Sequence, residues 1–262
     1  MPCIQDIADF LNDFAPTRLA EDWDNVGLLV GDAQASVNRV MTCLTITPES
    51  AAEAIAKAVN LIVTHHPLPF QPLRRLTVEN TSAKLLWNLI RAGVAIYSPH
   101  TGFDSAAEGI NQSLAQRIGL TEIRPLIPKL GDADSLGAGR VGNLQAKSLA
   151  ELIGDLKNQF GLMHVQFVGD LRAACTRVGI ACGSGGSFLA VAEGAGCNTF
   201  VTGEMTFHNC LEAKAKNISV VQLGHYASER FAVERLVVQL QKKFPDLVVW
   251  ASESESDPIG LW

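Results

Sequence analysis

The sequence predicts an α/β protein made of two similar α/β lobes. Short apolar runs alternate with stretches of helical periodicity along the whole chain, one strand–helix–strand window recurs, and several buried-type strands end in polar residues. This alternation is the pattern of βαβ units, which form mainly parallel sheets. The predicted fold class is therefore α/β with an internal duplication.

The individual elements follow from this pattern. Strands are expected where apolar runs stand between turn residues, at 26–30, 40–46, 61–64, 94–98, 140–144, 164–169, 177–182, 199–202, 219–223 and 247–250. Helices are expected where apolar residues recur every three to four positions, at 4–14, 49–58, 81–92, 106–118, 148–160, 187–195, 206–216 and 226–243.

The duplication shows as a gapless match at a shift of 138 residues, which lays Arg39–Thr64 over Arg177–Thr202. Seven of the 26 aligned positions are identical: Arg39/Arg177, Val40/Val178, Ala52/Ala190, Ala54/Ala192, Asn60/Asn198, Val63/Val201 and Thr64/Thr202. We expect lobe 1 to span 1–125, completed by 220–262, and lobe 2 to span 126–219. The segment 121–139, rich in Pro, Gly and Asp, is the expected linker.

Composition excludes several classes of protein. The 262 residues carry a net charge of −6, and no basic cluster exceeds the pairs Arg74-Arg75 and Lys242-Lys243, so no nucleic-acid partner is expected. No apolar stretch approaches the ~18 residues of a membrane span, and the N-terminus lacks the features of a signal peptide. We expect a cytoplasmic protein whose six cysteines, without CxxC spacing, stay reduced. Cys43 and Cys182 lie in apolar runs and are interpreted as small hydrophobes.

Three short segments hold most of the side chains that a metal would need. His65-His66 closes the apolar run 61–64, and Pro67 then ends that strand. His100 with Asp104, and His225 with Glu229, each follow another strand at a spacing of four residues. Because the carboxyl ends of parallel strands share one sheet edge, these segments can converge. The alternatives are hydrogen-bonded loop histidines and a solvated helix face.

The predicted ligands are His65, His66, Asp104, His225 and Glu229. Imidazole mixed with carboxylate and no thiolate suits Zn, Fe, Mn, Co or Ni better than Ca or Mg. Five such residues exceed the three of a usual catalytic zinc site and suit two divalent transition metal ions. Paired metals lower the pKa of a shared water and polarise the group under attack, which favours hydrolysis.

Together these motifs resemble those of the GTP cyclohydrolase 1 type 2 homologue family, the Nif-three-like proteins. The matching stretches are 21–28, Thr64–Pro67, His100–Asp104 with 109–111, Thr202–Glu204 with His208, and Gly224–Tyr226 through Glu229. The resemblance implies a dinuclear metal centre on the same five residues, two similar lobes with the metals in the cleft between them, and a ring-like homohexamer. Many relatives have Leu-Asp-x-Thr where this chain has Leu44-Thr45-Ile46-Thr47, which removes a carboxylate outside the five ligands.

The expected function is dinuclear metal-dependent hydrolysis of a nucleotide-like small molecule, with GTP ring opening as one candidate. The alternative is a non-catalytic metal-binding scaffold or regulatory protein. Glu204 lies over His66 in the repeat, so Glu204 and His208 are candidate acid/base residues; the alternative is that Thr206 caps a helix and Glu204 is merely exposed. The Gly/Ser loop 183–187 is either an anion site or a tight turn.

Overall fold

The computed structural model describes residues 1–131 and 136–260. It confirms a mixed α/β fold, and its internal contacts divide the chain into two units. Unit 1 comprises 1–103 and 230–262, and unit 2 comprises 104–229. Two helices run across the boundaries between the units, α4 (His100–Ser105) and α9 (His225–Lys243). No described helix meets the length and hydropathy needed to cross a lipid bilayer.

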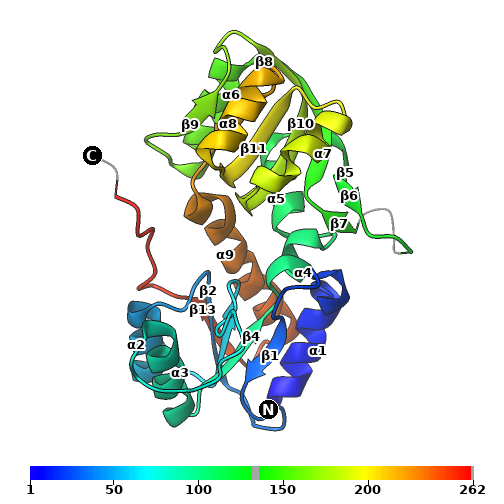
Figure 1. The fold of residues 1–262 in the computed structure, drawn as a ribbon. Helices are drawn as coiled ribbons and strands as arrows, with labels where there is room; N and C mark the ends of the chain where they lie inside the picture. The colour runs from blue at the N-terminus through cyan, green and yellow to red at the C-terminus, as the bar shows by residue number, and fades with distance from the viewer. Residues whose placement is uncertain (132–135, 261–262) are drawn as a thin grey trace. The chain divides into compact units, whose positions relative to one another are not determined.

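Unit 1 is built on a five-stranded sheet with the order β1-β4-β3-β2-β13. The strands of this sheet and the helices of the unit are α1 (Ile4–Phe14), η1 (Thr17–Leu19), β1 (Gly27–Val30), β2 (Arg39–Cys43), α2 (Pro48–Ala56), β3 (Leu61–Thr64), α3 (Thr81–Arg91), β4 (Ala95–Ser98) and β13 (Val248–Ala251). β1 is antiparallel to β4, and the remaining pairs are parallel. Helices α2 and α3 cover one face and share a core with Met41, Ile62 and Ile96, while α1 lies on the other side (Figure 1).

Unit 2 is built on a six-stranded sheet with the order β5-β8-β10-β11-β12-β9. Its elements are α5 (Ile110–Ile118), β5 (Thr121–Arg124), β6 (Ile127–Pro128), β7 (Gly137–Ala138), β8 (Arg140–Ser148), α6 (Leu149–Phe160), β9 (Gln166–Val168), β10 (Ala174–Ser184), η2 (Gly186–Phe188), α7 (Leu189–Gly194), β11 (Thr199–Glu204), α8 (Phe207–Ala215) and β12 (Ser219–Gln222). Helices α5 and α6 contact β8 and β10, and residues of α7 and α8 share a core with Phe200 and Val220 (Figure 1).

Local sequence signals start the helices where the periodicity predicts them. Thr47 accepts a hydrogen bond from the backbone of Ser50 ahead of Pro48 at the start of α2. Ser148 and Glu151 form a capping box that begins α6. Because such caps satisfy the first amide groups of a helix, its start can be read from sequence.

The two windows matched by the 138-residue shift have the same strand pairing. In unit 1, Val40 pairs with Leu61 and Cys43 with Thr64; at the same shift in unit 2, Val178 pairs with Thr199 and Ala181 with Thr202. A hydrogen bond repeats as well. Asn60 Oδ1 accepts from the Arg39 amide at 3.0 Å, and Asn198 Oδ1 accepts from the Arg177 amide at 3.3 Å.

The order of elements is also the same in both units. The series α1-β1-β2-α2-β3-α3-β4 in unit 1 corresponds to α6-β9-β10-α7-β11-α8-β12 in unit 2. In each series the first strand pairs antiparallel with the fourth at a sheet edge. The helix that follows β4 begins at His100. The helix that follows β12 begins at His225, after a short connecting turn.

The boundaries of these two units differ from those of the expected lobes, which were 1–125 with 220–262 and 126–219. Helix α5 and strand β5 belong to unit 2 because β5 pairs with β8 and α5 packs on β8 and β10. The expected linker 121–139 contains strands β5, β6 and β7, and its residues 132–135 lie outside the described part of the chain. Sequence composition marked this stretch as a loop because its strands are short and interrupted by Pro and Gly.

Candidate metal centre

In unit 1 the histidine pair lies at the carboxyl end of β3. The amide of His65 donates to the Cys43 carbonyl at 3.0 Å, so the sheet pairing continues past the end of the strand. The His65 carbonyl in turn accepts a 2.7 Å hydrogen bond from Ser98 Oγ, at the end of the parallel neighbour β4. The backbone around the pair is therefore held from both sides.

Three imidazoles gather at this edge. The ring centroids of His65 lie 5.0 Å from His66 and 5.1 Å from His100, and those of His66 and His100 are 5.6 Å apart. Each ring offers one nitrogen within 4.8 Å of the other two. His65 is only 1% exposed. His65 and His66 are predicted ligands, whereas His100 lies outside the predicted ligand set.

Asp24 fixes the orientation of the third imidazole. Its Oδ1 accepts from His100 Nδ1 at 2.7 Å, and its Oδ2 accepts from the amide and the hydroxyl of Thr101. The carboxylate is fully buried. Burial would raise the pKa of Asp24, but the hydrogen bonds from His100 and Thr101 outweigh it and lower the pKa to about 2. An ionised carboxylate only accepts, so the proton of neutral His100 sits on Nδ1 and the lone pair on Nε2.

A hydroxyl takes the corresponding position beside His66. Thr45 Oγ1 lies 2.6 Å from His66 Nδ1. The loop that holds Thr45 is fixed by Glu255, whose carboxylate accepts from the amides of Leu44 at 2.9 Å and Thr45 at 2.6 Å. Arg230 contacts Glu255 at 3.0 Å. Sequence reasoning missed Glu255, because nothing local links a residue so near the C-terminus to the strand end at 43.

Two large aromatic side chains stand beside this histidine cluster (His65, His66 and His100). Trp23 is 60% exposed and Phe70 is 45% exposed. Their ring centroids are 6.0 Å apart, and each lies about as far from the His100 ring, at 6.2 and 6.1 Å. Nothing local in the sequence pairs Trp23 with Phe70, because the two residues are far apart in the chain.

In unit 2, Asp104 is held by two residues. Cys182 Sγ lies 3.1 Å from Asp104 Oδ1, and Asn111 Nδ2 donates to the Asp104 carbonyl at 3.2 Å. Asn111 Oδ1 accepts from the Cys182 amide at 2.8 Å, which closes the arrangement. Burial, together with the charge of Asp104, raises the pKa of Cys182 well above its ordinary value, so the thiol keeps its proton and donates to Asp104. Cys182 is thus more than the small hydrophobe that its apolar run indicated.

The second predicted pair in unit 2, at the start of α9, is formed. His225 Nε2 lies 3.1 Å from Glu229 Oε2, and His225 Nδ1 lies 3.0 Å from Glu204 Oε1. The hydrogen bond to Glu229 outweighs burial and, with Glu204, raises the pKa of His225 to about 9. The imidazole is therefore charged between two carboxylates in the metal-free chain, and a metal would take the place of a proton.

The Gly/Ser loop lies against this pair. Gly183 has φ +58°, and a Cβ on it would come within 2.2 Å of Glu229 Oε1. Its amide donates to Ser228 Oγ at 3.0 Å, and the Gly185 amide donates to Thr202 Oγ1 at 3.2 Å. Because these two amides already have acceptors, the structure favours the tight-turn interpretation of 183–187 over the anion site.

The two residues predicted for acid/base chemistry have different surroundings. Glu204 is half exposed at the end of β11 and contacts His225. His208 is exposed on α8, where its ring lies edge-on to Phe207. Thr206 caps α8 by accepting from the Asn209 amide, as the alternative interpretation proposed.

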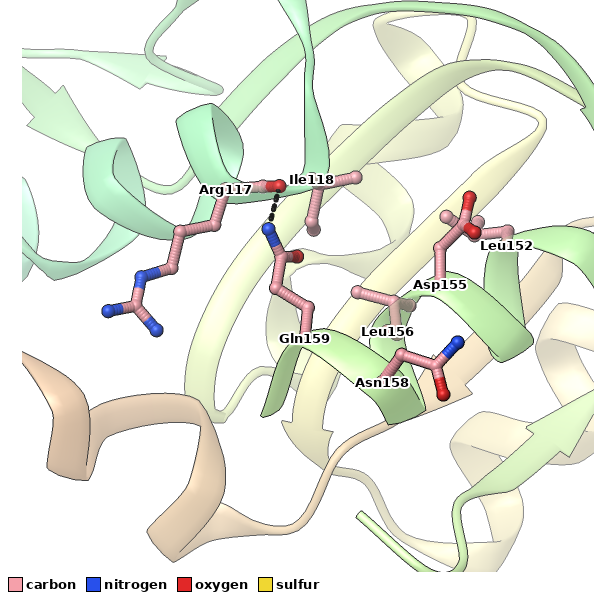
Figure 2. Close-up of a pocket in the computed structure, with 7 residues that line it drawn as sticks. All are labelled: Arg117, Ile118, Leu152, Asp155, Leu156, Asn158 and Gln159. Atoms are coloured by element: carbon pink, nitrogen blue, oxygen red, sulfur yellow. Dashed lines mark hydrogen bonds between the residues drawn. The ribbon is translucent and has the colours of Figure 1, made fainter. Parts of the chain in front are cut away.

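Two cavities in unit 2 lie away from these residues. One, of about 430 Å³, opens between α5 and α6 and is lined by Arg117, Ile118, Leu152, Asp155, Leu156, Asn158 and Gln159 (Figure 2). Gln159 donates to the Arg117 carbonyl at its rim. The other, of about 710 Å³, lies between β9 and α8. Neither cavity is lined by a predicted site residue.

The donor set fits a transition metal. A histidine that binds a metal usually has its other ring nitrogen hydrogen-bonded to an oxygen partner, which orients the ring. Fold and donors together define an α/β protein with a candidate metal centre. The family model Duf34/NIF3 (NGG1p interacting factor 3) matches residues 2–258, and the chain belongs to this family, which confirms the resemblance seen in the motifs.

Relatives and solved structures agree with this assignment. The chain is 32% identical over 260 residues to a Clostridium acetobutylicum protein named GTP cyclohydrolase 1 type 2 homolog, covering 97% of each. It is 32% identical to Drosophila melanogaster NIF3-like protein 1, covering 95% of this chain and 86% of the relative. Staphylococcus aureus protein SA1388 superposes with a TM-score of 0.90 at 26% identity, covering 100% of this chain and 99% of that one. Reduced HcgD from Methanocaldococcus jannaschii gives 0.82 at 26% identity, covering 96% and 98%.

Proposed function

We propose that this protein is a metal-dependent hydrolase that acts on a nucleotide-like small molecule. Its ligands would be His65 and His66 from unit 1 with Asp104, His225 and Glu229 from unit 2, holding two divalent transition metal ions. The observation that carries the proposal is the orientation of the imidazoles, because His66 and His225 each meet an oxygen partner at Nδ1. The relatives' name supports a nucleotide-related substrate.

We also propose that the two units arose by duplication. The shared register at a 138-residue shift supports this, as does the matching order of seven elements. On this view the strand end at His65-His66 in unit 1 corresponds to Gly203-Glu204 in unit 2. The duplication would explain why both units place polar groups at the same strand end.

The residues of the chain have distinct tasks in this reaction. Bound metal ions would supply Lewis acidity toward the water and the scissile group. Glu204 orients His225, and its half-exposed carboxylate is placed to accept or return a proton at Oε. The thiol of Cys182 holds Asp104 in one orientation. A direct acid/base task for His208 is the part of the proposal with the least structural support, since His208 is exposed on α8.

Metal analysis is the first test. We expect close to two transition metal ions per wild-type chain after purification, and loss of metal in His225→Ala and Glu229→Ala. His164→Ala is the matched control, because His164 is an exposed histidine of the same unit outside the site. Wild-type protein that neither retains nor takes up Zn, Fe, Mn, Co or Ni would overturn the proposal. Glu229→Gln, with thermal unfolding of each variant, separates lost ligation from lost folding.

Turnover is the second test. Metal-loaded protein is screened against GTP, other nucleotides, phosphoesters and cyclic amides, with Glu229→Ala as the blank. Metal-dependent product supports the hydrolase. Metal binding without turnover of any of these would favour the alternative, a metal-binding scaffold or regulatory protein. The mass of the assembly in solution tests the homohexamer that the family resemblance implies.

A further inference from the structure

We propose that Trp23 and Phe70 form a stacking platform for a planar heterocyclic ring, the base of a nucleotide. The inference rests on the proposed function in one respect, since it takes the substrate to be nucleotide-like. It deepens that function by assigning the residues that bind the base. Both residues belong to unit 1, so the platform is complete within one unit.

The first support is the exposure of the two rings. Trp23 is more than half exposed and Phe70 is nearly half exposed, although both side chains are large and mainly apolar. Leaving this much aromatic surface in water forgoes the free energy that burial would release. Open aromatic faces are available to a ligand, and every nucleobase has a π-face that can stack on them.

The second support is the arrangement of the rings. The planes of Trp23 and Phe70 are inclined at 55° with their centroids 6.0 Å apart, so the two rings form an angled platform rather than a closed stack. The ring of His100 stands nearly perpendicular to both, at 75° to Trp23 and 81° to Phe70. A base on this platform lies next to the histidine cluster, so the rest of the ligand can extend toward the candidate metal donors.

The third support is that the backbone around Trp23 is fixed. Trp23 lies in a turn that the Asp24 amide closes by donating to the Glu21 carbonyl at 2.9 Å. The Glu21 amide donates to Thr101 Oγ1 at 3.0 Å, which joins this turn to the start of α4. The position of Trp23 is therefore set by contacts that do not involve its exposed ring.

A hydrogen bond also joins the two segments that carry the platform. Asn25 Nδ2 donates to the Pro69 carbonyl at 2.7 Å, two residues after Trp23 and one before Phe70. This contact holds the two rings near each other in the unliganded chain. Rings that are positioned in advance lose little conformational freedom on binding, so more of the stacking energy appears as affinity.

Titration with GMP and with ribose 5-phosphate tests the platform, because the second ligand has a sugar phosphate but no base. Calorimetry on metal-loaded wild-type protein should show tighter binding of GMP, and GMP should quench tryptophan fluorescence. Trp23→Ala should weaken GMP binding by about fivefold or more, as expected for the loss of one base–aromatic stack. The same variant should bind ribose 5-phosphate as the wild type does.

Two further variants sharpen the comparison. Trp23→Phe keeps a ring, so it should retain most of the GMP affinity while losing most of the fluorescence quench. Trp87→Ala is the matched control, because Trp87 is a partly exposed tryptophan on α3, outside the site, and it should leave GMP affinity unchanged. Circular dichroism and thermal unfolding establish that each variant is folded. Should Trp23→Ala not fold, Phe70→Leu carries the affinity test and Trp23→Phe carries the fluorescence test.

The outcomes separate the inference from the proposed function. Wild-type protein that binds GMP no more tightly than ribose 5-phosphate, or Trp23→Ala with unchanged GMP affinity, would overturn the platform. A change of assembly mass in Trp23→Ala with GMP affinity unchanged would show instead that the ring packs between copies of the chain. GMP binding through Trp23 without turnover of any compound in the screen would refute the hydrolase and leave the platform. Metal-dependent turnover with the same KM in wild type and Trp23→Ala would refute the platform alone.

Discussion

The Nδ1 atom of His100 donates a 2.7 Å hydrogen bond to Oδ1 of Asp24, whose side chain is fully buried. Asp24 precedes β1 and His100 follows β4, so the antiparallel pairing of these strands brings together residues that are far apart in sequence. The pair fixes the tautomer of His100 and hence which nitrogen faces its neighbours.

Replacing Asp24 by Asn should cost about 1–3 kcal/mol of unfolding free energy, because it leaves a buried donor without an acceptor. An amide has one acceptor oxygen, so it cannot serve both His100 and Thr101. Urea unfolding measures the loss. Asp246→Asn, at an exposed position, is the control; equal unfolding free energies for the two variants would contradict the role of Asp24.

Replacing Gly183 by Ala should displace Glu229, because the new Cβ would lie 2.2 Å from its Oε1 in a left-handed backbone conformation. We expect a loss of about 2 kcal/mol or more of unfolding free energy, together with weaker metal binding. Gly154→Ala is the matched control, since Gly154 lies within α6 with open space around it and should gain about 0.5–1 kcal/mol. Urea unfolding of the two variants makes the comparison, and destabilisation of both by the same amount would refute the argument.

The thiol of Cys182 should act through Asp104. Cys182→Ala removes the donor to the carboxylate, and a hydrogen bond of this kind contributes about 0.5–1.5 kcal/mol, equivalent to roughly a two- to tenfold loss of metal affinity. Cys182→Ser keeps a donor and should restore most of that affinity. Isothermal titration with Zn²⁺ distinguishes the two variants. An alanine variant that binds as tightly as the serine variant would mean that the thiol only packs.

Acid should destabilise unit 1 through Glu53, a buried carboxylate. Burial would raise its pKa, but hydrogen bonds from Ser252, Trp250 and Lys57 outweigh it and lower the pKa to about 2, against 4.5 for an unperturbed Glu. Because the folded pKa is the lower one, the stabilisation is complete above about pH 4.5 and is lost as the pH falls toward 2. The loss amounts to about 3 kcal/mol.

Glu53→Gln tests this pH dependence. The variant should be less stable at neutral pH and should lose less stability than the wild type between about pH 4.5 and 2. Thermal unfolding across that pH range gives the comparison. Glu108→Gln, an exposed position, should follow the wild-type curve. A wild-type acid response that persists in Glu53→Gln would exclude Glu53 as its source.

Much of the fold could be predicted because its signals are local. Period-two and period-3.6 patterns, helix caps such as Thr47 and Ser148, and Pro67 at the strand end act over a few residues and survive in the folded chain. The windows matched by the 138-residue shift also share their strand register. The internal contacts place β5 in unit 2, because β5 is a short edge strand that pairs with β8, and that pairing leaves little trace in its own sequence.

The sequence by itself determined the α/β class, the family and the polar strand ends that carry His65, His66, Asp104, His225 and Glu229. Only the tertiary structure decided which groups orient them. Thr45 at His66, Glu204 at His225, Cys182 at Asp104 and Gly183 against Glu229 are contacts between segments distant in the chain. The physical reason is that the residue type of a ligand can be read directly from the sequence. Its orientation depends on hydrogen bonds and close packing that exist only once the strands are paired.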